Sequence, residues 1–418
     1  MSASCFARLC LAACAVSFCM PASSTAAEGN YSVRDFGAVG DGKADDTAAI
    51  QAALDAAMKG PRGSSVLIPP GEYRVTKSLT VENALLTGLA AGGWPADRGR
   101  LPTIRVDHTA TPCIIAKSAA SVNGLNFTYD HQKQEARKFG PTILLSGNGI
   151  SLTNLRIESP WEGIMADGVT NIGRLNIENV FIVGARECGV YVTNTYDIST
   201  LRNIEVWNPP DYSLSHCVGF KLGKNDEIRL DNCFAFKCKT GYLLVAEPKG
   251  TTWGGMTGCS ADFCVEGVVF ENGSLRINGG SFWAHMTAIR LEGAGRVVIS
   301  GADLKSNGEA TVIARGDVNA TITGCCIRKS GGQWATVPAA KIEGGKSVLI
   351  SGCTFGDQCP GIVIGPAVKN ILINDNIFQP CPYEAITDNS GSGTNKVIAN
   401  TLIHKTQQEA AKENGSIS

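Results

Sequence analysis

A short motif recurs along most of this chain, in the order apolar, polar, Gly or Asn, small, any residue, apolar. Its central position falls at twelve residues: Gly124, Asn154, Asn179, Asn203, Asn232, Gly258, Gly279, Gly301, Gly324, Gly352, Asp375 and Asn400. The motif recurs roughly every 25 residues, a period typical of solenoid repeats. A left-handed backbone costs least for Gly, Asn and Asp, so we expect a bend at each position.

Apolar residues flank these bends in two columns. Two positions before the bends the residues are Val122, Leu152, Ile177, Leu201, Leu230, Met256, Ile277, Ile299, Ile322, Ile350, Ile373 and Ile398. Three positions after the bends they are Phe127, Ile157, Ile182, Val206, Ala235, Ala261, Phe282, Leu304, Ile327, Phe355, Phe378 and Ile403. Because every member is apolar, we expect both columns to point inward and to stack from one repeat to the next.

A further strand follows a loop in each repeat, and its residues alternate between apolar and polar. Its inward residues are Ile143, Ile164, Val190, Phe220, Tyr242, Val268, Ile289, Val312, Ala340, Ile362 and Ile386. Three parallel strands per repeat predict an all-β fold, a single-stranded parallel β-helix of about twelve rungs.

The stretch from Tyr31 to Val75 differs from the repeats because it contains a segment with helical periodicity. The apolar residues of this segment share one helical face: Ile50, Ala53, Leu54, Ala57 and Met58. Asp45 or Asp46 is predicted to cap its start, and Gly60 to end it in the left-handed conformation. The apolar face is expected to cover the open end of the solenoid near Val122, where stacked strands leave exposed core.

This stretch also carries a family resemblance. The run DFGAVGDGKADDTAAIQAAL, followed by VLIPPGEY, resembles the N-terminal cap of the pectate-lyase-like superfamily, which includes rhamnogalacturonase/epimerase-like proteins. The resemblance implies a right-handed parallel β-helix with an N-terminal capping α-helix. It does not carry over catalytic residues, because the family hosts many reactions on one scaffold.

The catalytic signatures of two related enzyme groups are missing from this sequence. The strand positions hold neither the Gly-His-Gly nor the Asp-Asp of polygalacturonase-like hydrolases, and Arg290-Leu-Glu292 has a glutamate where their Arg-x-Lys has a lysine. The Asp-Pro-His signature of alginate epimerases is also missing.

The segment at 1–27 reads as a signal peptide, with Arg8 before an apolar core and small residues up to Ala27. We therefore expect a secreted or periplasmic protein, with lipoprotein anchoring through Leu11–Cys14 as the alternative. The expected domains are a β-helix at 28–404, with its cap at 31–76, and a polar tail at 405–418. The net charge of −1 gives no field that would attract nucleic acid, and no later segment is apolar enough to span a membrane.

Twelve of the 16 cysteines remain after this leader. Four of them follow a bend directly, in a column otherwise filled by small or aliphatic residues, and are predicted to be core residues: Cys233, Cys259, Cys325 and Cys353. Two pairs on neighbouring rungs are candidate disulfides in an oxidising compartment: Cys238 with Cys264, and Cys188 with Cys217.

Outward positions of the last strand in each rung supply the first group of candidate catalytic residues. Tyr191 and Lys221 are expected to be neighbours on adjacent rungs, and the loop before Lys221 adds Asp211 and His216. Asp167 lies beside them as a candidate for binding the substrate. A lyase acting on a uronate needs a base for the C5 proton, a cation for the carboxylate and an acid for the leaving oxygen. Lys221, His216 and Tyr191 could supply these functions, although an ordinary solvated strand face has the same composition.

A second group lies further along the same face. Glu271 and Glu292 occupy one column on adjacent rungs, roughly 5 Å apart, which is the spacing of a retaining glycosidase pair. Glu292, Arg315 and Glu343 alternate in sign, which favours a structural charge ladder instead. Arg290 remains a candidate for binding an acidic substrate. Trp207 lies at an outward position where an aromatic ring could stack on a sugar.

The leading functional hypothesis is a secreted enzyme that cleaves an acidic, uronate-containing polysaccharide by β-elimination or hydrolysis. The alternatives are a non-catalytic glycan-binding or cell-surface β-helix protein and a uronate epimerase. Secreted lyases of this type often use calcium, so the resemblance admits a Ca²⁺ ion. The scattered acidic residues form no calcium-binding loop, and we predict neither a cofactor nor a metal.

Overall fold

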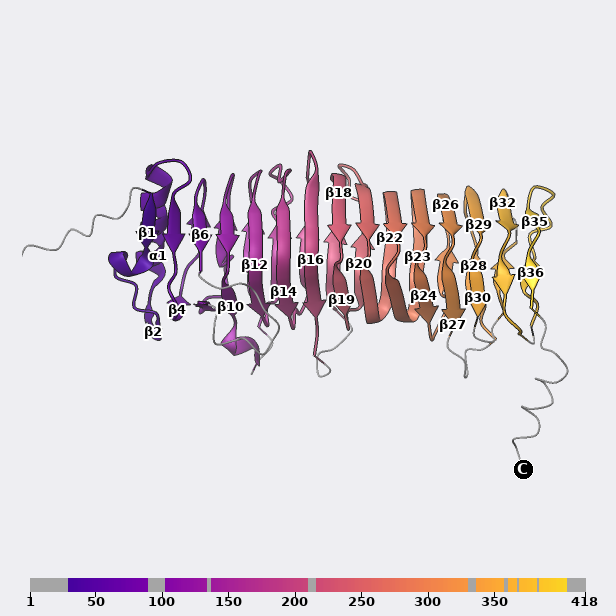
Figure 1. Ribbon diagram of the computed structural model, residues 1–418, viewed down its shortest axis with the longest axis horizontal. Helices are drawn as coiled ribbons and strands as arrows, with labels where there is room; N and C mark the ends of the chain where they lie inside the picture. Colours follow the sequence, from indigo (N-terminus) through magenta and orange to yellow (C-terminus); the bar gives the residue numbers. More distant parts are fainter. Residues whose placement is uncertain are drawn as a thin grey trace, which may run out of the picture.

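The computed structural model describes residues 29–88, 102–133, 137–209, 216–329, 336–356, 360–366, 368–381 and 383–403. The expected signal peptide at 1–27 and polar tail at 405–418 lie outside these residues. The described chain forms one elongated parallel solenoid, with the N-terminal helix α1 at one end and the last rungs at the other (Figure 1). Every strand pairs in parallel with the corresponding strand one rung away, which confirms the predicted fold class.

The first of three stacks contains the strands that precede the bends. It consists of β1 (Asn30–Ser32), β3 (Ser65–Leu67), β6 (Leu85–Thr87), β9 (Ser121–Asn123), β12 (Ser151–Glu158), β14 (Asn176–Val183), β16 (Ser199–Trp207), β18 (Asn225–Asp231), β21 (Thr252–Thr257), β22 (Ser260–Asn278), β23 (Ser281–Ser300), β26 (Val318–Thr323), β29 (Ser347–Ser351), β32 (Ile371–Asn374) and β35 (Lys396–Ile398).

The second stack contains the strands that follow the bends. The long strands β12, β14, β16, β22 and β23 take part in both stacks because they continue through the bend or from rung to rung. The other members are β2 (Asp41–Asp45), β4 (Glu72–Val75), β7 (Thr103–Val106), β10 (Asn126–Thr128), β19 (Phe234–Phe236), β24 (Asp303–Ser306), β27 (Cys326–Lys329), β30 (Thr354–Gly356), β33 (Ile377–Phe378) and β36 (Thr401–Leu402).

The third stack carries the candidate site. It consists of the middle parts of β22 and β23 together with β5 (Leu79–Val81), β8 (Ile114–Ala116), β11 (Ile143–Leu145), β13 (Glu162–Ala166), β15 (Cys188–Val192), β17 (Val218–Leu222), β20 (Thr240–Leu244), β25 (Val312–Ala314), β28 (Ala340–Ile342), β31 (Ile362–Ile364) and β34 (Ile386–Asp388).

Eleven of the twelve predicted bends are confirmed by a positive φ, which lies between 50° and 66° in the column from Gly124 to Asp375. The twelfth prediction is wrong by one residue, because Ala399 has the positive φ of 54°. Asn400 instead accepts hydrogen bonds from the backbone and side-chain nitrogens of Asn376. This shift turns the predicted inward residues Ile398 and Ile403 outward, and both are about half exposed.

The other members of the two bend-flanking columns are buried, as predicted, and so are the inward residues of the third stack up to Ile362. The four cysteines predicted to lie in the core are also buried. The candidate disulfides are not formed, because their four cysteines are free thiols. Cys217 lies close to Cys238, at an Sγ–Sγ distance of 3.9 Å.

Helix α1 (Thr47–Lys59) buries Ile50, Ala53, Leu54 and Ala57 against the first rungs, which confirms the predicted capping helix. The expected partner near Val122 is wrong, because α1 contacts β1, β3 and β5, and three strands of the first stack precede the strand that holds Val122. The apolar face of this helix therefore closes the N-terminal end of the solenoid, as expected for a capping element.

The two ends of α1 differ in part from the prediction. Of the two candidate capping residues, Asp45 accepts the Thr47 N–H at 3.1 Å, whereas the Asp46 carboxylate accepts the N–H groups of Val39 and Gly40. At the other end Gly60 is not left-handed, because its φ is −76°. A Cβ there would lie 2.7 Å from the Tyr31 hydroxyl, so close packing is what requires glycine.

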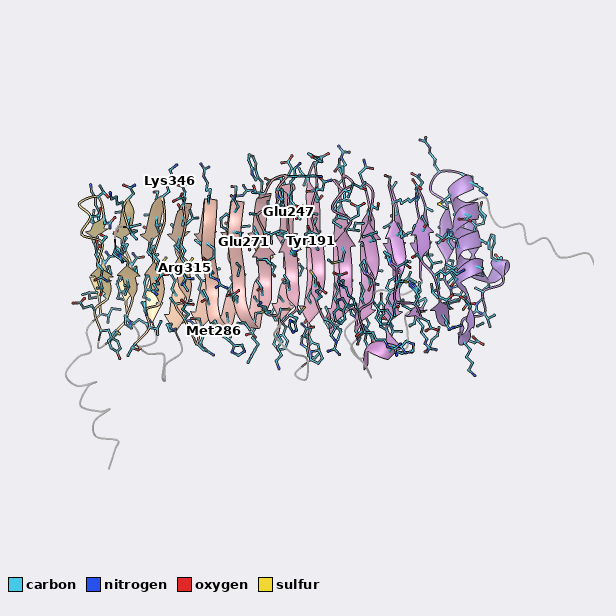
Figure 2. The ribbon with its side chains drawn as sticks, turned by 180° about the vertical axis from the view of Figure 1, so that it is seen from behind. Tyr191, Glu247, Glu271, Met286, Arg315 and Lys346 are labelled. Atoms are coloured by element: carbon cyan, nitrogen blue, oxygen red, sulfur yellow. The ribbon has the colours of Figure 1, made fainter. Side chains whose placement is uncertain are left out.

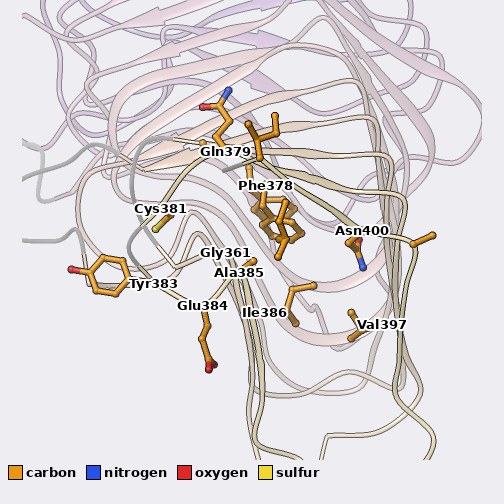
Figure 3. A pocket seen from close by; sticks show the side chains of 15 residues that line it. Gly361, Phe378, Gln379, Cys381, Tyr383, Glu384, Ala385, Ile386, Val397 and Asn400 are labelled. Carbon is orange, nitrogen blue, oxygen red and sulfur yellow. The ribbon is translucent and has the colours of Figure 1, made fainter. Parts of the chain in front are cut away.

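Short 3₁₀ helices occur at Val33–Phe36 in the cap and at Asp130–Lys133 in a loop. No helix in the described ranges is long and apolar enough to cross a membrane. The last rung leaves an open pocket with a volume of 630 Å³, where Phe378, Ile386 and Val397 line the end of the solenoid (Figure 3).

Candidate active site

Tyr191 and Lys221 project outward from β15 and β17 at neighbouring positions of the third stack. The parallel register pairs these two residues directly, as predicted from the sequence. The Lys221 ammonium lies 4.7 Å from the centre of the Tyr191 ring, close enough for a cation–π contact. The residues that pair with them on the outer rungs, Met165 and Leu243, are apolar, so apolar side chains flank this polar pair on both sides.

Glu247 reaches back to this pair from the loop that follows β20. Its carboxylate accepts hydrogen bonds from the Tyr191 hydroxyl at 2.5 Å and from the Thr193 hydroxyl at 2.6 Å. The backbone N–H of Lys224 is a third donor, at 3.2 Å. Three donors from two different rungs therefore hold the Glu247 carboxylate against the hydroxyl of Tyr191, and Lys221 contacts the ring of the same tyrosine.

The path of Glu247 depends on two neighbouring residues. Gly223 leaves the space that the side chain crosses, because a Cβ there would lie 2.1 Å from Glu247 Oε1. Glu271 supports the loop from the next rung, where its carboxylate accepts the Ala246 N–H at 3.1 Å. Figure 2 shows Tyr191, Glu247 and Glu271 on one face of the solenoid, with Arg315 further along.

The environment of Tyr191 keeps its phenol protonated. Burial is the main cause, and the hydrogen bond to Glu247 and the negative charge of that carboxylate add to it, so the pKa of Tyr191 lies well above its ordinary value. A phenolate beside Glu247 is therefore unfavourable. The phenol can take up a proton on its oxygen only while its own proton passes to the carboxylate.

A second carboxyl group interacts with Lys221 from the preceding rungs. Glu162, at the start of β13, is half-buried, and its burial together with the Glu187 carboxylate raises the pKa of Glu162 against the opposing charges of Lys138 and Lys221. Glu187 also accepts a hydrogen bond from the Trp161 indole at 2.6 Å. The site therefore combines a carboxyl group that is prone to protonation, a cation and a hydrogen-bonded phenol.

The other residues predicted for this group have different surroundings. Asp167 accepts hydrogen bonds from Thr170, Ser146 and the Val169 N–H. Burial opposes ionisation of this carboxyl group, but the hydrogen bonds outweigh burial and lower the pKa of Asp167. This pattern closes a turn. His216 is exposed and precedes β17, whereas Lys221 lies near the end of that strand. Asp211 lies outside the described residues.

The second predicted group forms a network of ion pairs. Arg290 pairs with Glu266 and with Glu292, and Arg315 joins Glu292 at 3.2 Å to Glu343 at 2.6 Å. Glu292 is thus shared between two guanidinium groups, as in a charge ladder. Its predicted partner Glu271 supports the loop of Glu247, so the two carboxylates have different local tasks.

Trp207 lies at the outward end of β16 and stacks on Phe236 of β19, with 5.9 Å between ring centres and 6° between ring planes. It belongs to the second stack, whereas Tyr191 and Lys221 belong to the third. No cluster of three or more His, Cys, Asp or Glu side chains in the described part of the chain is arranged to hold a metal ion.

Glu247 and Glu162 are the two site residues that the sequence reasoning missed. Glu247 lies in an insertion outside the repeats, and it meets Tyr191 across 56 residues of sequence. One signal was present in the sequence. Gly223 occupies an outward position directly after a strand, where a side chain is normally tolerated, and such a glycine indicates a close approach by another group.

Comparisons with known proteins agree with this architecture. The sequence profile of the family described as rhamnogalacturonase A/epimerase, pectate lyase-like, matches residues 31–268, which is more than half of the chain. The chain belongs to this family. A second profile, for the right-handed β-helix region, matches residues 266–415 and agrees with the handedness expected for this pectate-lyase-like protein. The first match includes both partners of the Tyr191–Glu247 contact.

Among curated proteins, the chain is similar to alginate lyase 7 of Azotobacter vinelandii, with 65% identity over 46 residues, 11% of this chain and 5% of that protein. It is also similar to mannuronan C5-epimerase AlgE5 of the same organism, with 53% identity over 58 residues, 14% of this chain and 6% of that protein. These matches span only a small part of each relative.

Among solved structures, the A-module of mannuronan C5-epimerase AlgE6 from Azotobacter vinelandii superimposes with a TM-score of 0.59 and 17% identity. The superposition covers 90% of this chain and all of that one. At this level of identity the likeness establishes a shared fold.

Proposed function

We propose that this protein acts on an acidic polysaccharide by removing the C5 proton of a uronate residue, and that β-elimination follows. The observation that carries the proposal is the hydrogen bond from the Tyr191 hydroxyl to Glu247, together with the contact of the Lys221 ammonium with the Tyr191 ring. A carbon acid next to a carboxylate becomes reactive when a cation neutralises that carboxylate and a base is held near the proton. Both kinds of group are present at this position.

Each residue has one task in the proposed reaction. Lys221 binds the uronate carboxylate and stabilises the negative charge that develops on it. Tyr191 takes the C5 proton while its own proton passes to Glu247, so no phenolate accumulates. The electron pair of the C5–H bond forms the C4–C5 double bond as the C4–O bond breaks. Glu162, whose pKa is raised, donates a proton to the leaving oxygen.

Two related reactions share part of this machinery. A C5-epimerase removes the same proton but returns one to the opposite face of the sugar. The alginate lyase and epimerase relatives are consistent with a common first step, although their matches cover little of either protein. Hydrolysis is favoured by a separate observation, because Glu162 and Glu187 are neighbouring carboxyl groups and Glu162 has a raised pKa.

Product analysis on a panel of uronate polymers distinguishes these reactions. Elimination gives unsaturated ends that absorb in the ultraviolet, hydrolysis gives reducing ends without that absorbance, and epimerisation changes the polymer without cleaving it. We expect Tyr191→Phe and Lys221→Met each to lower kcat by roughly 10²-fold or more. Normal activity in both variants, or no activity of the native protein on any uronate polymer, would reject the proposal.

Lys239 provides the control for removal of a positive charge. It lies between β19 and β20 and is exposed, and it makes no contact with Tyr191 or Glu247 among the described interactions. Lys239→Met should therefore keep the kcat of the parent protein. An equal loss of activity in Lys239→Met and Lys221→Met would indicate a general effect of net charge instead of a role for Lys221 in the reaction.

We also propose that the protein is exported. The proposal follows from the leader-like sequence at 1–27, with its apolar core and the small residues that precede Glu28. Sequencing of the mature N-terminus from the host cell tests it, because cleavage after Ala27 is expected and an intact Met1 would contradict it.

A further inference from the structure

A line of aromatic side chains follows the edge of the second stack, away from Tyr191 and Lys221. Trp207 stacks on Phe236, the Phe236 and Phe263 ring centres are 5.7 Å apart, and those of Phe263 and His285 are 5.8 Å apart. Trp283 extends the line on β23, where it pairs with Asp262 of the preceding rung. We call these five residues, Trp207, Phe236, Phe263, Trp283 and His285, the aromatic ledge.

The ledge presents its rings to solvent. Phe263 is 49% exposed and Trp283 is 41% exposed, whereas burial is the usual state of large aromatic side chains. Phe263 also has a φ of 52°, a left-handed conformation that is unfavourable for a bulky residue. Packing of the solenoid core does not require this ring, because it projects outward between the parts of β22 that belong to the second and third stacks.

Basic side chains lie over the rings of the ledge. The Lys237 ammonium is 5.7 Å from the Phe236 ring centre, and the Lys305 ammonium is 5.7 Å from that of Trp283. Neither lysine forms an ion pair with any residue that the structure describes. Lys305 shares the surface with the Asp262 carboxylate, on which its charge acts, without forming an ion pair. An anionic group that rests on the rings can therefore approach both ammonium groups.

A pocket with a volume of 260 Å³ opens at the centre of the ledge. Its lining combines aromatic, basic and hydrogen-bonding groups: Asp262, Phe263, Trp283, Ala284, His285, Lys305 and Asn307. A sugar ring presents one face of C–H bonds and an edge of polar groups. Such a ring can stack on Trp283 while Lys305 binds a carboxylate substituent and Asp262 accepts a hydroxyl proton.

We propose that the aromatic ledge is a second, non-catalytic binding surface for an acidic polysaccharide. The rungs repeat about every 4.8 Å, so aromatic contacts on successive rungs form a continuous track along the solenoid axis. The proposal shares with the proposed function only the class of polymer. Binding along the ledge requires no turnover, and it differs from the reacting site in its strands and in its side chains.

The test measures binding without catalysis. Tyr191→Phe protein is titrated with polygalacturonate and with alginate, and a neutral dextran shows the contribution of charge. We expect Trp283→Ala to weaken binding of an acidic polymer about tenfold, as for an aromatic hot spot. Trp253→Ala is the matched control, because Trp253 is 60% exposed but lies on β21 of the first stack. The control should bind like the parent protein.

A second variant separates loss of binding from loss of folding. Phe263→Gly removes the ring and also relieves the left-handed conformation, so it should weaken binding without destabilising the fold. Lys305→Ala should reduce the salt dependence of binding. An exposed apolar surface could instead bind a second copy of this chain. Sedimentation without glycan tests this by measuring whether the protein is a monomer or a dimer.

Three results would overturn the ledge proposal. They are unchanged binding in both Trp283→Ala and Phe263→Gly, equal losses in Trp283→Ala and Trp253→Ala, and a dimer that Trp283→Ala dissociates. Turnover of a uronate polymer whose binding does not involve the ledge would overturn the ledge proposal and leave the proposed reaction standing. Binding that depends on the ledge, in a native protein without turnover, would support the ledge and reject the reaction.

Discussion

Gly223→Ala is a direct test of the proposed site, because Gly223 provides the space through which Glu247 reaches Tyr191. A Cβ at this position would lie 2.1 Å from Glu247 Oε1, 2.4 Å from its Cδ and 2.5 Å from Thr193 Oγ1. Ordinary contacts of a Cβ begin at 3.4 Å, so the carboxylate oxygen must retreat by roughly 1 Å or more. A shift of this size breaks hydrogen bonds of 2.5 and 2.6 Å.

The expected cost has two parts. Hydrogen bonds to a charged group contribute about 1.5–3 kcal/mol each, but the displaced carboxylate regains water, so we expect the free energy of unfolding to fall by only about 1–3 kcal/mol. Activity should fall by roughly 10²- to 10⁴-fold, because the carboxylate that accepts the Tyr191 proton is displaced. The backbone of Gly223 is not left-handed, so alanine adds no conformational strain there.

The assay compares kcat and the denaturation midpoint in Gly223→Ala and in a matched control. Gly255→Ala is that control, since the nearest atom to its new Cβ is 3.6 Å away and both properties should stay unchanged. A loss in Gly223→Ala alone would therefore come from the space that Glu247 occupies and not from the general replacement of a strand glycine.

Titration of Tyr191 in Glu247→Gln examines the same contact. The pKa of Tyr191 should fall toward its ordinary value but stay above it, because burial is the larger cause. A folded-state pKa above the unfolded value contributes stability that is present below the unfolded pKa and is lost as pH rises through the folded pKa. Because Glu247→Gln reduces the shift, it should reduce this contribution at neutral pH and make the alkaline loss of stability smaller, as denaturation at several pH values can show.

A double-mutant cycle decides whether Gly223 acts through Glu247. If it does, Gly223→Ala should have little further effect on the activity of Glu247→Gln protein, because the carboxylate that accepts the Tyr191 proton is already lost. Full activity of Gly223→Ala, or additive losses in the double variant, would refute this reasoning.

Four further predictions concern the bends, a buried thiol and the carboxyl group of Glu162. Ala399 and Asn203 are both left-handed. Ala399→Gly should therefore stabilise the protein by up to about 1 kcal/mol, and Asn203→Val should destabilise it by about 1–2 kcal/mol or more. Chemical denaturation measures both changes. The Cys188 thiol should resist alkylation until the protein is unfolded, because burial raises its pKa, as peptide mapping can show. Glu187→Gln should lower the pKa of Glu162 and move the alkaline limb of the kcat profile to lower pH.

The sequence predicts the repeats well because each rung obeys the same physical constraint. A left-handed bend selects Gly, Asn or Asp, and its apolar flanks must stack on equivalent residues, so the period shows in residue types alone. The prediction failed at Asn400 because Ala399 carries the bend, and alanine gives no such signal. The error lies in the last described rung, where Ile398 and Ile403 are about half exposed.

The site follows a different logic. The register alone brings Tyr191 next to Lys221, and the sequence predicts this neighbourhood correctly. Glu247 comes from a loop that no repeat specifies, and its contact with Tyr191 depends on the turn closed between Glu247 and Gly250. Periodicity can therefore locate the face on which chemistry is expected, but it cannot identify a residue delivered by an insertion.

This separation explains why the most recognisable part of the chain says little about its reaction. The run from Asp35 to Gln51 contributes to a cap whose helix buries Ile50 and Leu54 against the first rungs. Any solenoid with an open end needs such a cap, whatever its substrate. The proposed reaction depends on Tyr191 and Glu247, several rungs away, where a loop and a glycine replace the regular repeat. Similarity in the cap can thus persist while the chemistry changes, and the contact between Tyr191 and Glu247 is the place to test it.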